Sequence, residues 1–310
     1  MMRGISATTE KFLLDLERLQ KRSAKAQQQL SSGLKITKVS DAPDEVSRLL
    51  IARANLASVV QTQQNLGRVK LEVDTAEKAL QNAVSLLERA RTLTAQGAND
   101  LQGPATRRQI ASELQGILER LVAVAATAVE DRYLFSGDSD QTPPYELDLS
   151  TNTGVGPYQG SAPNRMIADT SGLLFSIAQS ADVIFDAPDP ENKVFAAVQG
   201  ARRALLAVDQ PTDPPDPTIP TVAQALRQLE TANRYLNQQL ASYGLIQNRV
   251  REALDAATRL EISQRAQIAE IEEADLAQVA VELTQTRTVL EAALQARAAN
   301  PRRSLFDVLR

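Results

Sequence analysis

A strict heptad repeat is the strongest pattern in this sequence. Apolar residues recur at alternating spacings of three and four, which predicts the seam of a coiled coil. They are Leu66, Val69, Val73, Ala76, Leu80, Ala83, Leu87 and Ala90. The helical pattern around them begins near Asp44 and stops at Gly97. A helix of roughly 50 residues would be about 75 Å long, far longer than an ordinary globular helix.

A second heptad frame lies in the last third of the chain, and a shorter helical pattern opens at Pro104. The second frame consists of Leu226, Leu229, Leu236, Leu240, Tyr243, Val250, Leu254 and Ala257, with Asn233 and Gln247 as polar members. Two seams from opposite thirds of a chain can satisfy one another, so we expect an intramolecular seam. Its predicted residues are Leu66, Val69, Val73, Leu80, Leu87, Leu236, Leu240, Val250 and Leu254.

The two ends of the chain carry weaker apolar stripes. Polar residues interrupt both stripes, and helices of this kind are marginal alone. We expect them to have little else in their own chain to pack on and to order only against other subunits. The predicted assembly residues are Phe12, Leu16, Leu19, Leu30, Leu276, Val279, Leu283, Leu290, Leu305 and Phe306.

The character of the chain changes at Tyr133, where short apolar runs begin to alternate with Gly- and Pro-rich turns. Such alternation predicts short β-strands. The predicted fold is mainly α: a long antiparallel helical bundle or coiled coil, formed by the N- and C-terminal segments, with a small β-rich inserted domain. The expected domains are residues 1–43 with 270–310, residues 44–131 with 191–269, and residues 132–190.

Composition excludes several kinds of site. The 310-residue chain has no Cys, His or Trp and a formal charge of −4. Without His or Cys, imidazole-activated nucleophiles, thiol chemistry and zinc sites are excluded. The mildly acidic balance argues against nucleic acid as the main partner. No stretch approaches the 18 apolar residues or so of a membrane span, and the N-terminus lacks the apolar core of a signal peptide.

The short charged clusters predict no chemistry. The loop around Asp138 and Asp140 lacks the ligand spacing of a calcium site. Glu272 and Glu273 are adjacent on a predicted helix and point in different directions. The sequence therefore predicts no catalytic, cofactor-binding or metal-binding residue, and no cofactor.

Two segments near opposite ends resemble the signatures of one family. They are residues 29–36 (QLSSGLKI) with residues 40–43 (SDAP), and residues 271–277 (IEEADLA). Both resemble segments of the flagellins and flagellar hook-associated proteins. The family usually has Asp where Ala42 stands, which should slightly weaken the cap of the following helix.

Further segments are similar to the branch of that family that joins the flagellar hook to the filament. They are residues 132–137 (RYLFSG), 144–145 (PY), 157–160 (PYQG) and 304–309 (SLFDVL). The resemblance spans nearly the whole chain. Val308 stands where Tyr is usual in that branch.

The resemblance implies a structural subunit of the bacterial flagellum and no enzyme. Members of this branch form one layer between hook-associated protein 1 and the flagellin filament. They are exported unfolded by the flagellar type III system, without a cleaved signal, to the extracellular flagellum. The implied partners are hook-associated protein 1, flagellin, copies of the same chain and an export chaperone. The terminal helices would line the inner wall of the tube, and the insertion would face outward.

Three other readings stay open from the sequence. A short flagellin would share the terminal signatures but would polymerise into long filaments. A secreted effector would need clustered reactive side chains within residues 133–190. A cytosolic coiled-coil adaptor would have terminal helices that are ordered in the monomer.

Overall fold

The computed structural model describes residues 3–38, 42–99, 101–209 and 216–299. The elements are α1 (Arg3–Ser32), α2 (Pro43–Gly97), α3 (Pro104–Ala125), β1 (Ala128–Val129), β2 (Arg132–Tyr133), β3 (Met166–Ala168), β4 (Leu174–Ser176), α4 (Ala181–Phe185), the 3-10 turn η2 (Pro190–Asn192), α5 (Val194–Asp209), α6 (Val222–Glu272) and α7 (Leu276–Ala299). They form a terminal unit, residues 1–59 with 260–310, and a central unit, residues 60–259. The predicted mainly α fold is confirmed.

Local chemistry explains where the long helices begin. α2 begins at Pro43, whose missing N–H is not needed in a first turn, and Asp44 and Glu45 follow at the positive end of the helix dipole. A capping box precedes α6: Thr221 N donates to Gln224 Oε1 at 2.8 Å, and Gln224 N donates to Thr221 Oγ1 at 3.3 Å. Asp41, whose residue type suits a helix cap before α2, lies outside the described residues.

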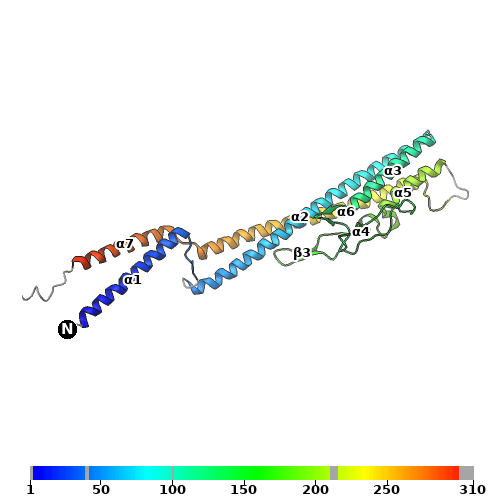
Figure 1. Ribbon diagram of the computed structural model, residues 1–310. Helices are drawn as coiled ribbons and strands as arrows, with labels where there is room; N and C mark the ends of the chain where they lie inside the picture. The colour runs from blue at the N-terminus through cyan, green and yellow to red at the C-terminus, as the bar shows by residue number, and fades with distance from the viewer. Residues whose placement is uncertain (1–2, 39–41, 100, 210–215, 300–310) are drawn as a thin grey trace, which may run out of the picture. The chain divides into compact units, whose positions relative to one another are not determined.

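Within the central unit, α2 and α6 lie side by side and antiparallel (Figure 1). Gln63 of α2 donates to Thr258 of α6 at 3.0 Å. Further along, Gln247 of α6 donates to Asp74 of α2 at 2.7 Å. Residue numbers rise on one helix as they fall on the other, so the first and last thirds of the chain meet as predicted.

The region between α3 and α5 holds little β-structure. β1 pairs with β2 across a two-residue turn, and β3 pairs with β4 so that Ile167 lies opposite Phe175. Turns, the short helix α4 and η2 make up the rest. The predicted short strands therefore exist at Arg132 and Met166 but reach only two or three residues each.

A cluster of aromatic rings fills the core beneath these turns. The Phe135 ring packs edge-on against Phe185 and Tyr243, with centroids 6.1 and 6.3 Å apart. Phe195 of α5 stacks on Phe185 at 5.4 Å. Such pairs stabilise a core beyond the area they bury. Because Tyr243 belongs to the α6 heptad frame, the cluster ties the irregular segment to the helical seam.

In the terminal unit, α1 and α7 form an antiparallel hairpin (Figure 1). Arg22 of α1 is 2.9 Å from Glu282 of α7, and the guanidinium of Arg297 lies 5.5 Å from the ring centre of Phe12. The sequence-based expectation that these helices have little of their own chain to pack on is therefore wrong. Each helix offers the other a stripe, although polar residues such as Ser23 and Thr286 interrupt it.

Candidate assembly site

All the residues predicted for the intramolecular seam lie in the central unit. Those buried are Leu66, Val69, Val73, Leu80, Leu87, Leu236 and Val250. Leu240 and Leu254 are partly buried and pack against the core. Leu66 is covered by Ala253 and Ala257, which are small residues one helical turn apart on α6. This burial gives the long helices a continuous apolar contact.

One face of the α1–α7 hairpin is covered by the chain itself. Its buried or half-buried residues are Phe12, Leu16, Leu19, Ala26, Val279, Leu283 and Leu290. Val279 and Leu283 were expected to contact other subunits, yet both are buried against Ala26. The structure gives these two a packing role inside the chain, while contacts of the hairpin with other subunits stay a prediction.

A second set of apolar side chains on the hairpin faces solvent. It consists of Leu13, Leu14, Leu30, Leu276, Val281, Val289 and Leu294, with exposures from 41% at Leu30 to 56% at Val281. We call this set the outer apolar residues. Only Leu30 and Leu276 were predicted, because the sequence reading followed one stripe per helix. The pair Leu13–Leu14 was the available sign of a second apolar face. Leu305 and Phe306 lie outside the described residues.

The two terminal signatures meet in the terminal unit. Each signature interrupts a pair of helices: residues 33–42 separate α1 from α2, and residues 273–275 separate α6 from α7. Ala274 N donates to Gly33 O at 2.9 Å, and Lys35 N donates to Glu272 O at 2.6 Å. In the sequence these two segments stood out only by their resemblance to one family. That resemblance gave no indication that they bind each other.

The RYLFSG and PYQG segments pack against each other through buried and hydrogen-bonded side chains, and these side chains serve the fold. Phe135 and Ser136 are fully buried, and Tyr158 Oη donates to the carbonyls of Phe135 and Ser161 at 3.2 and 3.1 Å. The glycines are required for close approach. A Cβ on Gly137, whose φ is +65°, would lie 1.8 Å from Ser161 O.

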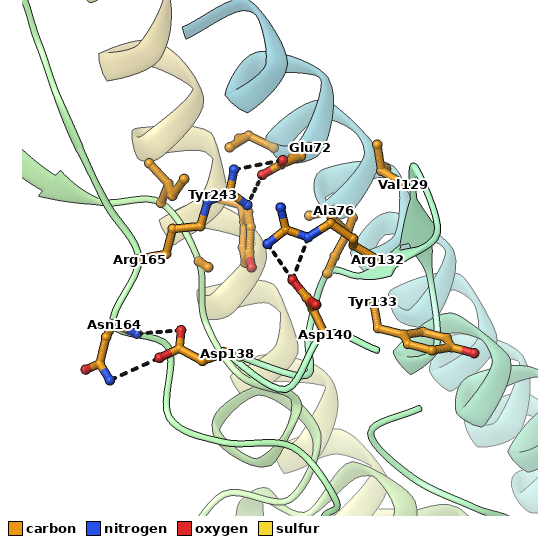
Figure 2. A pocket seen from close by; sticks show the side chains of 15 residues that line it. Glu72, Ala76, Val129, Arg132, Tyr133, Asp138, Asp140, Asn164, Arg165 and Tyr243 are labelled. Carbon is orange, nitrogen blue, oxygen red and sulfur yellow. Dashed lines mark hydrogen bonds and ion pairs between the residues drawn. The ribbon is translucent and has the colours of Figure 1, made fainter. Parts of the chain in front are cut away.

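A pocket of about 360 Å³ lies between α2, α6 and the turns (Figure 2). Figure 2 shows that its charged side chains engage one another. Arg165 binds both carboxylate oxygens of Glu72, at 2.7 and 2.9 Å. Arg132 pairs with Asp140, and Asn164 donates to Asp138 at 3.1 Å. These charges hold the turns on α2 and offer little to a ligand.

Hydrogen bonds and burial shift the pKa values of three groups in this part of the central unit. Hydrogen bonds from Gln141 and Arg132 outweigh burial and hold the pKa of Asp140 below its usual range. Burial raises the pKa of Tyr243, and raises the pKa of Tyr158 to about 12. Such phenols stay protonated and do not act as bases near neutral pH. The absence of a catalytic residue stays a prediction from the sequence.

The described residues contain no group of three or more carboxylates placed to hold a metal ion. None of their helices combines the length and apolar character that crossing a bilayer requires. The outer apolar residues are exposed side chains of the kind that a protein–protein contact can cover.

Comparison with known proteins points the same way. The pattern of the bacterial flagellin N-terminal helical region matches residues 7–140, and that of the bacterial flagellin C-terminal helical region matches residues 226–306. Together these matches cover more than half of the chain. They take in both terminal signatures and both halves of the heptad seam.

Individual relatives are more distant. Flagellin B of Helicobacter pylori is 29% identical over 141 residues, covering 45% of this chain and 27% of the relative. Flagellar hook-associated protein 3 of Salmonella typhimurium is 26% identical over 186 residues, covering 57% and 58%. The chain thus spans less than two thirds of either relative. A structure of a putative flagellar hook-associated protein from Vibrio parahaemolyticus shares the fold, with a TM-score of 0.64, 16% identity, and 75% of this chain and 100% of that one covered.

Proposed function

The chain belongs to the bacterial flagellin family, and we propose that it is the structural subunit that joins the flagellar hook to the filament, as hook-associated protein 3 does. The observation that carries the proposal is the α1–α7 hairpin, which covers one apolar face internally and leaves the outer apolar residues in solvent. The likeness to hook-associated protein 3 of Salmonella typhimurium supports the choice of this family member.

In this role the outer apolar residues make contacts between neighbouring subunits. Exposed leucines and valines on two paired helices are costly in water and favourable once a second helical surface covers them. The hairpin would line the inner wall of the tube, and the turns of residues 132–190 would face outward. Residues 1–43 with 270–310 would then be the assembly domain, marginally ordered until neighbours bind. The seam of α2 and α6 would keep its long helices stiff.

The proposed partners are hook-associated protein 1 on one side, flagellin on the other, and copies of this chain within the layer. An export chaperone would bind the apolar C-terminal stripe before the type III system exports the chain to the extracellular flagellum. We propose no enzymatic role, because in the pocket of Figure 2 the charged side chains pair with one another and burial raises the pKa of Tyr243.

Deletion of the gene tests the proposal. We expect cells with hooks but no filaments, flagellin shed into the medium, and no motility. Complementation with the intact gene should restore filaments. Normal filaments in the deletion strain would contradict the proposal.

The second candidate is a short flagellin, which the match to Flagellin B of Helicobacter pylori favours. Electron microscopy of the purified chain under conditions that seed flagellin growth separates the two. A junction subunit should add a limited layer to the seeds. Long filaments made of this chain alone would establish the flagellin alternative.

The remaining alternatives have tests of their own. A coiled-coil adaptor would show strong hydrogen-exchange protection at residues 5–30 and 276–296 in the isolated monomer, whereas a junction subunit should gain that protection on assembly. An effector would need a reactive cluster within residues 133–190, where Asp138, Asp140 and Arg165 are engaged with other side chains.

A further inference from the structure

The two helix breaks of the terminal unit are joined by main-chain hydrogen bonds. We call residues 33–35 and 272–274 the clasp. Ala274 N donates to Gly33 O at 2.9 Å, and Lys35 N donates to Glu272 O at 2.6 Å. These bonds flank Leu34 and Glu273, which face each other as an antiparallel bridge. Segments about 240 residues apart in the chain thus form a single small β-structure.

Side chains hold both halves of the clasp in place. Gln29 Nε2 donates to Lys35 O at 3.0 Å. Glu272 is 9% exposed and its carboxylate lies 2.5 Å from Arg53 Nη2 of α2. Asp275 then caps α7 by accepting from the N–H groups of Ala277 and Gln278, at 3.0 and 3.1 Å. Lys35, Glu272 and Asp275 are therefore each held by a side-chain contact.

The backbone at Gly33 suits this arrangement. Its φ of +73° is the left-handed conformation that ends a helix, and its N–H donates back to Gln29 O at 2.8 Å. Because the carbonyl of Gly33 then points out of α1, it can accept from Ala274. The three clasp residues on one side directly follow α1, and the three on the other side come just before α7.

Each terminal helix depends on packing for stability, because tertiary contacts of an apolar face supply most of the stability of a protein helix. α1 has 30 residues and α7 has 24, and their shared face is interrupted by polar side chains. Bringing two helices from distant parts of the chain together costs loop-closure entropy. A contact that holds their ends together meets this cost for both helices and fixes their register. The clasp is placed to do this, because it joins the end of α1 to the start of α7.

We propose that the clasp is the nucleus of the α1–α7 hairpin, so that the two helices order and melt together as one unit. Closing the clasp brings the stripe with Ala26 opposite the stripe with Val279 and Leu283. Opening it releases both helices at once. This coupling is a property of the isolated chain and does not depend on whether the chain serves at the junction or in the filament.

A pair of proline substitutions tests the coupling. Ala274→Pro removes the N–H that binds Gly33 O. Leu276→Pro, the control, adds a proline at the first residue of α7, where no N–H is required. In hydrogen exchange of the full chain, A274P should lower protection at both residues 12–30 and 276–296 by about tenfold, the effect of losing one hydrogen bond. L276P should leave both unchanged.

Loss confined to residues 276–296 in A274P would show that the helices order independently and would overturn the proposal. Equal loss in both variants would assign the effect to proline itself and would overturn it as well.

A disulfide across the clasp tests the coupling in the opposite direction, because it stabilises the clasp. This test still decides whether the helices are coupled if the wild-type hairpin shows no protection against hydrogen exchange. In an antiparallel bridge flanked by hydrogen bonds, as at Leu34 and Glu273, Cα atoms lie about 4.5 Å apart, which a disulfide can span. The chain has no other Cys. Oxidised L34C/E273C should gain protection in both helices relative to its own reduced form. No gain, or a gain in one helix only, would contradict a shared nucleus.

Discussion

Gln247 of α6 reaches across the seam and donates its amide hydrogens to two carboxylates of α2: Asp74 at 2.7 Å and Glu77 at 2.8 Å. Gln247 occupies a heptad position where an apolar residue would otherwise stand. A single polar residue in such a seam fixes register at some cost in stability. The side-chain bonds therefore determine which turn of α6 lies against which turn of α2.

Gln247→Glu should destabilise the central unit most at neutral pH. The substitution keeps the shape but replaces the donor with a third carboxylate beside Asp74 and Glu77. We expect the free energy of unfolding at pH 7 to fall by about 2 kcal/mol, the range for hydrogen bonds to charged groups. The neighbours raise the pKa of the new carboxyl, so the loss should shrink as the pH falls and the group binds a proton. Denaturant unfolding at pH 7 and pH 4 measures this, and an equal loss at both values would contradict the geometry.

Asp74 gives the seam a predictable acid dependence. Burial raises its pKa, but hydrogen bonds from Lys70 and Gln247 outweigh burial and hold the pKa below its ordinary value. A carboxyl with a lowered folded-state pKa stabilises above its unfolded pKa, about 3.9, and loses that contribution as the pH falls through the folded value. The stability advantage of wild type over Asp74→Asn should therefore be full at pH 7 and vanish in strong acid. An advantage that stayed constant with pH would show that Asp74 acts only by packing.

Arg107→Ala should lower the free energy of unfolding far more than Arg89→Ala, which removes a partner from an exposed ion pair. Arg107 of α3 and Asp209 of α5 are 3.2 Å apart, and their side chains are only 12% and 14% exposed. Removing one partner leaves a nearly buried charge, so we expect a loss of about 3 kcal/mol. The control is Arg89→Ala, because Arg89 and Glu113 form a pair whose side chains are 57% and 43% exposed. That pair should contribute less than about 1 kcal/mol, and equal losses in denaturant unfolding would contradict the contrast.

Leu80→Ala tests the seam itself. Leu80 is fully buried, and its truncation should lower the free energy of unfolding by about 3 kcal/mol. Leu71 lies on the same helix but is 53% exposed, so Leu71→Ala should cost less than about 0.5 kcal/mol. Both follow from thermal or denaturant unfolding of the full chain. Similar costs would mean that α2 does not present one face to α6.

The sequence predicted the helical part of the fold because that part obeys a periodic rule. The heptads placed Leu66 and Val250 in the core, where both are found, and the helix ends predicted near Asp44, at Gly97 and after Pro104 lie within one residue of those observed. Periodicity also relates residues of one helix to one another, which is why a single stripe was easy to recognise.

The contacts between distant segments within the terminal unit were not predictable in this way. The pairing of Leu34 with Glu273 depends on main-chain hydrogen bonds, which leave no side-chain pattern in the sequence. Most of the outer apolar residues, such as Val281 and Val289, were overlooked because they lie off the stripe that marks the inner face. Residues 1–43 were grouped with 270–310, but the stripes did not indicate that α1 packs on α7, because each is interrupted by polar residues and looks unfinished alone.

One complementation experiment tests the central claim, that the outer apolar residues form contacts between subunits. Val289 of α7 and Val208 of α5 are 51% and 48% exposed, so an aspartate at either site should disturb the fold of the monomer little. In a strain that lacks the gene, filaments are counted by electron microscopy after complementation with Val289→Asp or Val208→Asp. We predict hooks without filaments for V289D and normal filaments for V208D. Normal filaments with V289D would contradict the account.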